Sequence, residues 1–246
     1  MQDFSYKDID QEGLDTLMAI SGADAFNKWM YEATSPFLKG SILEIGSGIG
    51  NISSQFILRG KTITLSDIRS NYIRHLQTNF QKEATVKDIL HLDLVENDFS
   101  STHQNLLSAF DSLFALNVVE HIKDDELAIQ NAASLLKPGG SMVILVPANQ
   151  WMYNSLDKDL YHYRRYSSGS LSKLMLQAGL NVQKSFYFNA LGTAGWIISG
   201  SIFKNRIIKP GQMNLFNKMV PLARLIDKIT RRFYGLSVVV VAQKPL

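Results

Sequence analysis

The sequence predicts an α/β fold in which a mostly parallel sheet is doubly wound, with helices on both of its faces. Five short apolar stretches between residues 41 and 146 alternate with helical ones, which is the pattern of successive strand-helix-strand units. Right-handed crossovers then leave little freedom in how these units connect. The length of 246 residues, with 46% hydrophobic and 19% charged residues, suits one large folded domain with a substantial core.

The alternation follows a helical lead-in. Residues 9–35 carry apolar side chains at helical spacing up to the break at Ser35-Pro36. The turn Lys137-Pro138-Gly139-Gly140 ends the last helix of the series, because proline and glycine do not continue a helix. The predicted strands are 41–45, 62–65, a stretch within 85–92, 111–116 and 141–146, and the predicted helices are 49–58, 70–81 and 125–136.

The order of elements changes after Pro147. We expect about seven strands in all, with the last one antiparallel to the others. The segments that follow Pro147 are a polar aromatic stretch over 151–168, a helix over 170–178, a strand over 182–188, an apolar stretch over 190–203, a basic helical region and a final strand over 237–242.

Composition excludes several classes of site. The chain has no cysteine, which rules out disulfides, thiolate metal sites and cysteine nucleophiles, and we expect no metal. The N-terminus has no basic segment followed by an apolar run, so a cytoplasmic location is expected. The longest uncharged stretch, 186–203, is diluted by polar residues and glycines, so we do not expect it to span a membrane.

Positive charge is concentrated near the C-terminus. Residues 200–246 contain nine Lys and Arg against Asp227 alone, a net charge of +8, within a chain whose total is +3. Such a region can contact anionic lipid, nucleic acid or a phosphorylated substrate. A solvated helix face is the structural alternative. With the apolar stretch after Asn189, the basic residues Lys204, Arg206, Lys209, Arg231 and Arg232 also suit peripheral contact with an anionic membrane surface.

A glycine-rich loop follows the first predicted strand. Gly46, Gly48 and Gly50 allow a tight turn and bring backbone amides close to a ligand. Asp67 ends the second strand, where a carboxylate can accept hydrogen bonds from both ribose hydroxyls. Loop and acid together predict a nucleoside ligand. The dinucleotide pattern requires a third glycine where this chain has Asn51, which argues against an NAD-dependent oxidoreductase.

Four motifs in order resemble those of class I S-adenosylmethionine (AdoMet) dependent methyltransferases, which have a Rossmann-like fold. The resemblance covers about residues 40 to 148. It implies AdoMet as cofactor and S-adenosylhomocysteine as product. The motifs are Leu43-Glu44-Ile45-Gly46-Ser47-Gly48-Ile49-Gly50, Asp67-Ile68, Leu116-Asn117-Val118-Val119-Glu120-His121-Ile122 and Leu135-Leu136-Lys137-Pro138-Gly139-Gly140.

The resemblance also implies roles for individual residues. Asp67 would bind the ribose, Ile68 would contact the adenine, and Asn117 would lie beside the sulfonium. An acid after the third strand would receive the adenine amino group, and we favour Asp93, with Leu94, over Asp88 because Asp88 falls inside the strand. The loop residues assigned to the cofactor are Glu44, Gly46, Ser47, Gly48, Gly50 and Asn51.

Methyl transfer from a sulfonium is an in-line displacement, so the protein mainly has to position the acceptor and exclude water. A base helps when the acceptor is a hydroxyl or an acidic carbon, and histidine titrates in the suitable range. His121 follows Asn117 on the loop after the fourth strand, where it serves as a base or only braces the loop. His162 lies in an aromatic and cationic cluster and is the leading candidate for base or orienter.

The cluster around His162 is similar to a Gly-His-Tyr-Arg-Arg-Tyr-Ser motif in a type 11/12-like bacterial branch of these methyltransferases. Tyr161 stands where that branch usually has glycine. The resemblance extends through Asn189 and Trp196 and so covers nearly the whole chain. Arg164 or Arg165 would bind an anionic group, or would pair with a carboxylate such as Asp157. The residues assigned to the acceptor are Tyr161, Tyr163, Arg164, Arg165 and Asn189.

We therefore expect a single methyltransferase domain, 1–246, made of a lead-in (1–40), an AdoMet-binding core (41–148) and an acceptor-side half (149–246) with a helical insertion at about 189–235. The expected acceptor is a small or lipid-like molecule, methylated at oxygen or carbon. A nucleic-acid or tRNA methyltransferase that uses the basic C-terminus is the main alternative, although no base-methylation tetrad or RNA-binding motif is present. A non-catalytic scaffold is a further alternative.

Overall fold

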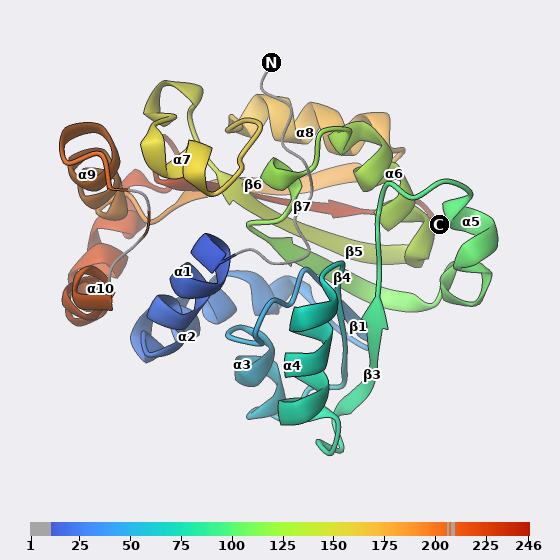
Figure 1. Cartoon of the computed structure of the whole chain (residues 1–246). Coiled ribbons are helices and arrows are strands. Elements are labelled where there is room, and N and C mark those ends of the chain that lie inside the picture. Colours follow the sequence, from blue (N-terminus) through green and yellow to red (C-terminus); the bar gives the residue numbers. More distant parts are fainter. Residues whose placement is uncertain (1–10, 206, 208–209) are drawn as a thin grey trace.

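The computed structural model describes residues 11–205, 207 and 210–246, and its centre is one seven-stranded sheet. The strand order is β3-β2-β1-β4-β5-β7-β6, and β7 runs antiparallel to both of its neighbours, while the strands from β3 to β5 pair in parallel (Figure 1). The predicted seven strands and the antiparallel last strand are confirmed. The strands are β1 Ile42–Ile45, β2 Ile63–Asp67, β3 Val86–His91, β4 Phe110–Leu116, β5 Leu136–Pro147, β6 Asn181–Phe188 and β7 Ser237–Gln243.

Helices cover both faces of this sheet. One face packs against α5 (Phe99–Thr102), α6 (Asp125–Leu135) and α8 (Ser168–Gln177). The other face packs against α2 (Asp24–Thr34), α3 (Ser53–Ile57), α4 (Ser70–Phe80) and α10 (Pro210–Thr230). The central strands are apolar on both sides, as sheets covered on both faces require.

Strand β5 shows how the two cores are built. Its buried residues alternate between the faces because successive side chains of a strand point to opposite sides. Met142 and Ile144 belong to the core beneath α6 and α8, whereas Val143 and Leu145 belong to the core beneath α2 and α10.

The lead-in is not one helix. It divides into α1 (Gln11–Ser21) and α2, with Gly22 between them. The predicted helix 49–58 also shortens to α3, because Gly50 has a φ of +87°, which no right-handed helix accommodates. The residues predicted as a turn at 137–140 fall within the bounds of β5, where the pairing with β4 shifts register between Leu136 and Ser141 and Gly139 has a φ of +75°.

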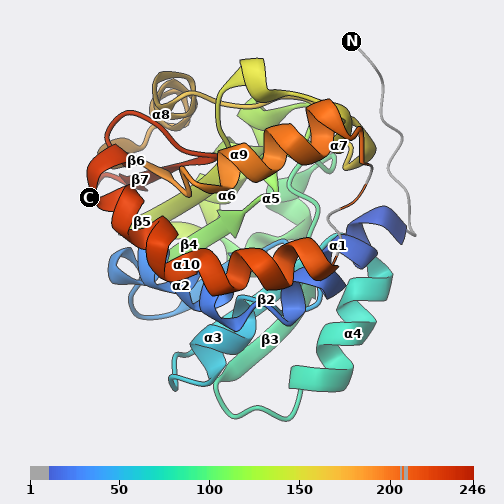
Figure 2. The ribbon, with the colours of Figure 1, turned by 90° about the vertical axis from the view of Figure 1, so that its left-hand side faces the viewer.

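The C-terminal half carries the remaining helices. A short α7 (Ser155–Asp159) lies within the polar aromatic segment, and α9 (Gly192–Trp196) continues into a π-helix, Ile197–Ile202. Both views place α9 and α10 next to each other on one flank of the molecule (Figures 1 and 2). Among the helices of the part that the structure describes, none is long and apolar enough to cross a membrane. Of the basic residues predicted to contact a membrane, Arg206 and Lys209 lie outside the described residues.

Candidate active site

A cavity of about 810 Å³ opens at the carboxyl ends of the parallel strands. Its floor comes from the loops after β1, β2, β3 and β4, and its outer walls come from α1, α9, the π-helix and the first half of α10. Ligands of open α/β sheets bind at this edge. The order of strands reverses between β1 and β4, so the cavity lies at the switch point of the sheet.

The glycine loop forms one end of the cavity. Gly46 has a φ of +70°, and a β-carbon there would overlap the Val118 side chain. The position therefore accepts only glycine. Gly50 is not among the residues that line the cavity, and a β-carbon there would overlap the Phe80 ring of α4, so this glycine has a packing role and its contact with the cofactor stays a prediction. The loop residues that do line the cavity are Glu44, Gly46, Ser47, Gly48 and Asn51.

Asp67 is buried at the end of β2 and lines the cavity. Its Oδ2 accepts a hydrogen bond from the Gly48 N–H at 2.9 Å, and its Oδ1 accepts one from the Arg69 N–H at 2.9 Å. Burial raises the pKa of this carboxyl, although the backbone hydrogen bonds oppose the shift. The carboxylate thus joins the glycine loop to β2 and faces the cavity where a ribose diol would be bound.

Glu44 is also buried beneath the glycine loop. The hydroxyl of Ser53, at the start of α3, donates to its carboxylate. Burial raises the pKa of Glu44 to about 8, against the effect of the Ser53 and Ser47 hydroxyls. Its side chain is therefore largely protonated at neutral pH, and it braces the loop while it contributes to the cavity wall.

The two candidate adenine acids occupy different environments. Asp93 lines the cavity with Leu94 and Ile68, and its Oδ1 accepts a hydrogen bond from the Val95 N–H at 2.9 Å. Asp88 is exposed within β3 and is not among the residues that line the cavity. The geometry therefore supports Asp93 over Asp88 as the residue that faces the adenine.

The acceptor side of the cavity begins after β4. Asn117 lines the cavity with a φ of +55°, and the short helix Val119–His121 follows it. His121 meets the segment after α7, where its ring lies edge-on to the ring of His162 with centroids 4.7 Å apart. Both predicted histidines thus come together in the cavity, from parts of the chain about 40 residues apart.

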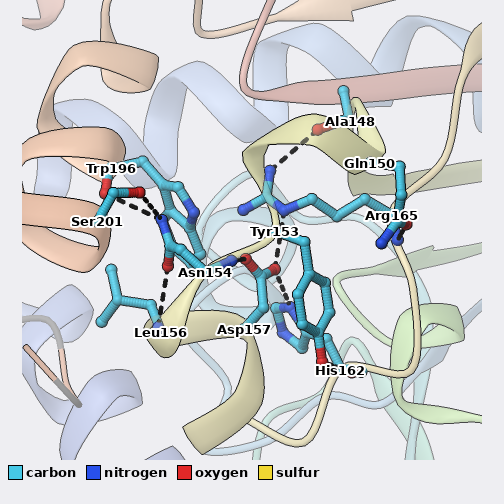
Figure 3. A network of polar contacts seen from close by, with 10 residues as sticks. All are labelled: Ala148, Gln150, Tyr153, Asn154, Leu156, Asp157, His162, Arg165, Trp196 and Ser201. Carbon is cyan, nitrogen blue, oxygen red and sulfur yellow. Dashed lines mark hydrogen bonds and ion pairs between the residues drawn. The ribbon is translucent and has the colours of Figure 1, made fainter. Parts of the chain in front are cut away.

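His162 is held by a buried carboxylate (Figure 3). Its Nδ1 lies 2.8 Å from Oδ1 of Asp157, and the same oxygen accepts a hydrogen bond from Nε of Arg165 at 2.8 Å. Burial would raise the pKa of Asp157, but its contacts with His162 and Arg165 outweigh burial and hold that pKa below its usual range. Since an ionised carboxylate only accepts hydrogen bonds, Nδ1 carries the hydrogen and Nε2 keeps its lone pair.

Both imidazoles are neutral at physiological pH. Burial lowers the pKa of His162, against the opposing effect of Asp157. Burial, with the nearby His162 and Arg69, lowers the pKa of His121 well below its usual value. A neutral imidazole whose second nitrogen is fixed by a carboxylate is the arrangement that general-base catalysis requires.

Glu120 completes the polar end of the cavity. It is fully buried, and neither of its carboxylate oxygens has a hydrogen-bond partner within residues 11–205, 207 and 210–246. Burial raises its pKa to about 8, although the charge of Arg165 opposes the shift. The ligand atoms of Glu120, His121 and His162 lie within 4.8 Å of one another, so these three side chains are the ones that can hold a metal ion here.

The residues predicted to contact the acceptor divide into two groups. Tyr163, Arg165 and Asn189 line the cavity. Tyr161 and Arg164 are not among its lining residues, so the structure does not place them with the other three. The Arg164 guanidinium instead pairs with Asp125 at 2.6 Å and donates to the Lys123 carbonyl at 2.6 Å.

Arg165 has a structural role as well as a place in the cavity wall. Besides Asp157, it donates to the Ala148 carbonyl at 2.9 Å, and its guanidinium stacks over the Trp196 ring at 4.7 Å from the centroid. The sequence left open whether an arginine binds an anionic group or pairs with Asp157, and Arg165 pairs with Asp157. These contacts anchor the segment that carries His162 to both the end of β5 and α9.

Three contributors to the site were not assigned from the sequence. Glu120 stands next to His121, and its charge within an otherwise apolar segment is the signal that marks it. From the sequence, Asp157 is expected only as a partner for an arginine. The third contributor is α1, whose Leu17 carbonyl accepts a hydrogen bond from the Asn51 side chain at 2.9 Å, so that this helix closes over the glycine loop. Its amphipathic pattern alone does not say what it covers.

The lining fits AdoMet. The glycine loop leaves no room for β-carbons, a buried carboxylate faces the position of the ribose, and a second acid and two apolar side chains lie where an adenine would bind. Residues 23–185 match the family model described as a methyltransferase domain. The chain belongs to this family. It is an AdoMet-dependent methyltransferase with the Rossmann-like class I fold, and AdoMet is its cofactor.

Relatives agree with this assignment. The methyltransferase is 26% identical over 186 residues to a ubiquinone biosynthesis O-methyltransferase from Dinoroseobacter shibae, a match that covers 68% of this chain and 71% of the relative. It is 23% identical over 155 residues to the Chromobacterium violaceum protein of that name, covering 58% of this chain and 65% of the relative. A SAM dependent methyltransferase from Archaeoglobus fulgidus superposes with a TM-score of 0.62 at 16% identity, over 93% of this chain and 98% of the other. The chain thus spans about two thirds of the length of these relatives.

Proposed function

We propose that this methyltransferase methylates a hydroxyl group of an amphiphilic small molecule, with His162 as the general base. The observation that carries the proposal is the contact between Nδ1 of His162 and the Asp157 carboxylate, which leaves Nε2 of a neutral imidazole available in the cavity. The two relatives from Dinoroseobacter shibae and Chromobacterium violaceum are both named as O-methyltransferases, which supports oxygen as the acceptor atom.

The bound cofactor supplies the methyl group from its sulfonium. The acceptor oxygen would form a bond to the methyl carbon as the bond between that carbon and sulfur broke, and the bonding pair would remain on sulfur. The hydroxyl proton passes to Nε2 of His162. Asp157 stabilises the resulting imidazolium through Nδ1, and the products are a methyl ether and S-adenosylhomocysteine.

The walls of the acceptor side support an amphiphile. Polar groups gather at one end, where His121, His162 and Glu120 meet. The cavity is also lined by many apolar side chains, among them Leu156, Leu160, Leu191, Trp196, Ile198, Leu215, Phe216 and Met219. A molecule with a hydroxyl-bearing head and an apolar body would satisfy both groups of side chains, whereas a charged nucleic-acid backbone would meet apolar ones.

Transfer of label from tritiated AdoMet tests the proposal. The purified protein is incubated with lipid-extractable, water-soluble and tRNA fractions of bacteria, and the label is followed in each. We expect label in the lipid-extractable fraction, attached as a methyl ether by mass spectrometry, and at least a hundredfold less with His162→Ala. Label in tRNA, or as C-methyl or N-methyl groups, would contradict the proposal.

A further inference from the structure

Helix α10 has an exposed apolar stripe on the side that faces away from the sheet. Leu215, Leu222, Leu225 and Ile229 recur at helical spacing, and their exposed fractions range from 50% to 77%. The inner side of the helix is also apolar, because Val220 and Ala223 are buried in the core beneath α2 and β7. An exposed apolar stripe of this length has no role in packing the monomer and marks an interaction surface.

A second element extends the stripe. The π-helix after α9 exposes Ile198 and Ile202, and Phe203 follows it with 68% of its surface exposed. The side chain of Gln212, near the start of α10, donates to the Ser199 hydroxyl of the π-helix at 3.2 Å. The two elements therefore lie side by side, as Figure 2 shows for α9 and α10.

The exposed charged side chains of α10 and of the segment after the π-helix are basic, although Glu32 of the adjacent α2 pairs with one of them, Arg224, at 2.7 Å. Lys204, Lys218, Lys228 and Arg232 are exposed along this flank. Asp227 is the one acidic residue between positions 160 and 246 of the sequence. Its carboxylate is buried and accepts hydrogen bonds from the backbone N–H groups of Asn189 and Ala190, so it does not offset the exposed cations.

The flank also surrounds one side of the cavity. Ile198 and Leu215 each line the cavity, and each is at least 46% exposed at the surface. The exposed apolar surface of this flank is therefore continuous with the wall of the cavity.

We propose that α10 and the π-helix dock the protein on a bilayer that contains anionic lipid. The apolar stripe would insert at the level of the headgroups, and the flanking lysine and arginine side chains would pair with lipid phosphates. A nucleic acid would use the cations but leave the leucines and isoleucines exposed to water, so the combination favours lipid. Docking in this orientation would open the cavity toward the bilayer.

Vesicle co-sedimentation tests the docking surface without cofactor or acceptor, so its result is independent of the proposed methyl transfer. The vesicles are phosphatidylcholine alone, or phosphatidylcholine with phosphatidylglycerol. We expect binding to the anionic vesicles that weakens with salt. Lys218→Gln and Lys228→Gln should each weaken it about fivefold. Leu222→Glu with Ile229→Glu should weaken it at least tenfold.

The control is Leu176→Glu, which places a charge at a position of 57% exposure on α8, a helix on the other face of the sheet. Circular dichroism and AdoMet affinity report that each variant is folded. Equal binding of wild type to neutral and anionic vesicles would overturn the proposal. So would no binding, unchanged binding of the α10 variants, an equal loss in the control, or retention on tRNA in place of vesicles.

Discussion

The imidazole of His162 and the carboxylate of Asp157 lie 2.8 Å apart, and His162 lines the cofactor cavity. Replacement of His162 by alanine removes the base and should lower kcat about 10²-fold or more, because general-base catalysis contributes about 10² to 10⁴. AdoMet affinity should remain within twofold, since His162 lies on the acceptor side. Rates of methyl transfer and calorimetry check the two effects, with His91→Ala, an exposed histidine at the end of β3, as control. Turnover equal to wild type would remove His162 from the mechanism.

Glu120 gives a test based on stability. Its pKa rises from 4.5 to about 8 on folding because it is buried. Between these two values the folded protein holds a proton that the unfolded chain releases, so this group stabilises the fold below pH 4.5 and its contribution is lost as the pH rises toward 8. The loss is at most about 1.4 kcal/mol per pH unit. Glu120→Gln lacks this pH-dependent contribution. Between pH 6 and 8 the unfolding free energy of wild type should therefore fall relative to that of the variant. Above pH 8 the two free energies should change in parallel. Urea unfolding measures both, and parallel curves from pH 6 upward would show that Glu120 is ionised in the folded state.

Removal of divalent metal distinguishes two uses of Glu120, His121 and His162. If His162 is the base, dialysis against a chelator should leave turnover unchanged, because the displacement needs no Lewis acid. If the three side chains instead hold a metal ion, turnover should fall and return with added Mn²⁺ or Zn²⁺, and Glu120→Gln should abolish that recovery. Assay of the chelated protein with and without each ion decides between them.

Asp67 makes two hydrogen bonds to backbone N–H groups and faces the position of the ribose. Asp67→Ala should weaken AdoMet binding at least tenfold, or about 1.4 kcal/mol, because it removes a charge-assisted contact and loosens the glycine loop. Calorimetry with AdoMet measures the change. Asp88→Ala, an exposed carboxylate of β3 that does not line the cavity, is the matched control and should bind as wild type does. Unchanged affinity for Asp67→Ala would overturn the ribose assignment.

The strands and the cofactor loop were predictable because each depends on local chemistry. Short apolar stretches ended by Gly46, Asp67 or Asn117 describe parallel strands and the edge at which they end, and the sheet order agrees with that description. The mismatch with the dinucleotide pattern is also local, because it depends only on Asn51 standing where that pattern requires a third glycine. Gly50 shows the limit, because its contact is with Phe80, which is 30 residues further along the chain.

The acceptor side was less predictable because tertiary contacts decide which side chains face the cavity. Arg164 and Arg165 are adjacent in sequence, yet one pairs with Asp125 outside the cavity and the other with Asp157 at its wall. Tyr161 has a left-handed φ of +60°, so this loop has a backbone conformation that favours glycine in spite of its side chain. The helix α1 closes over the loop of Asn51 through a contact that no periodicity encodes.

A crystal structure of the protein with S-adenosylhomocysteine tests the central claim most directly. We expect the ribose hydroxyls on Asp67, the adenine between Ile68 and Leu94 with its amino group toward Asp93, and the sulfur beside Asn117. In that position the sulfur would face the group formed by Glu120, His121 and His162. A ligand whose ribose lies away from Asp67, or whose sulfur is directed away from His162, would contradict both the cofactor assignment and the proposed base.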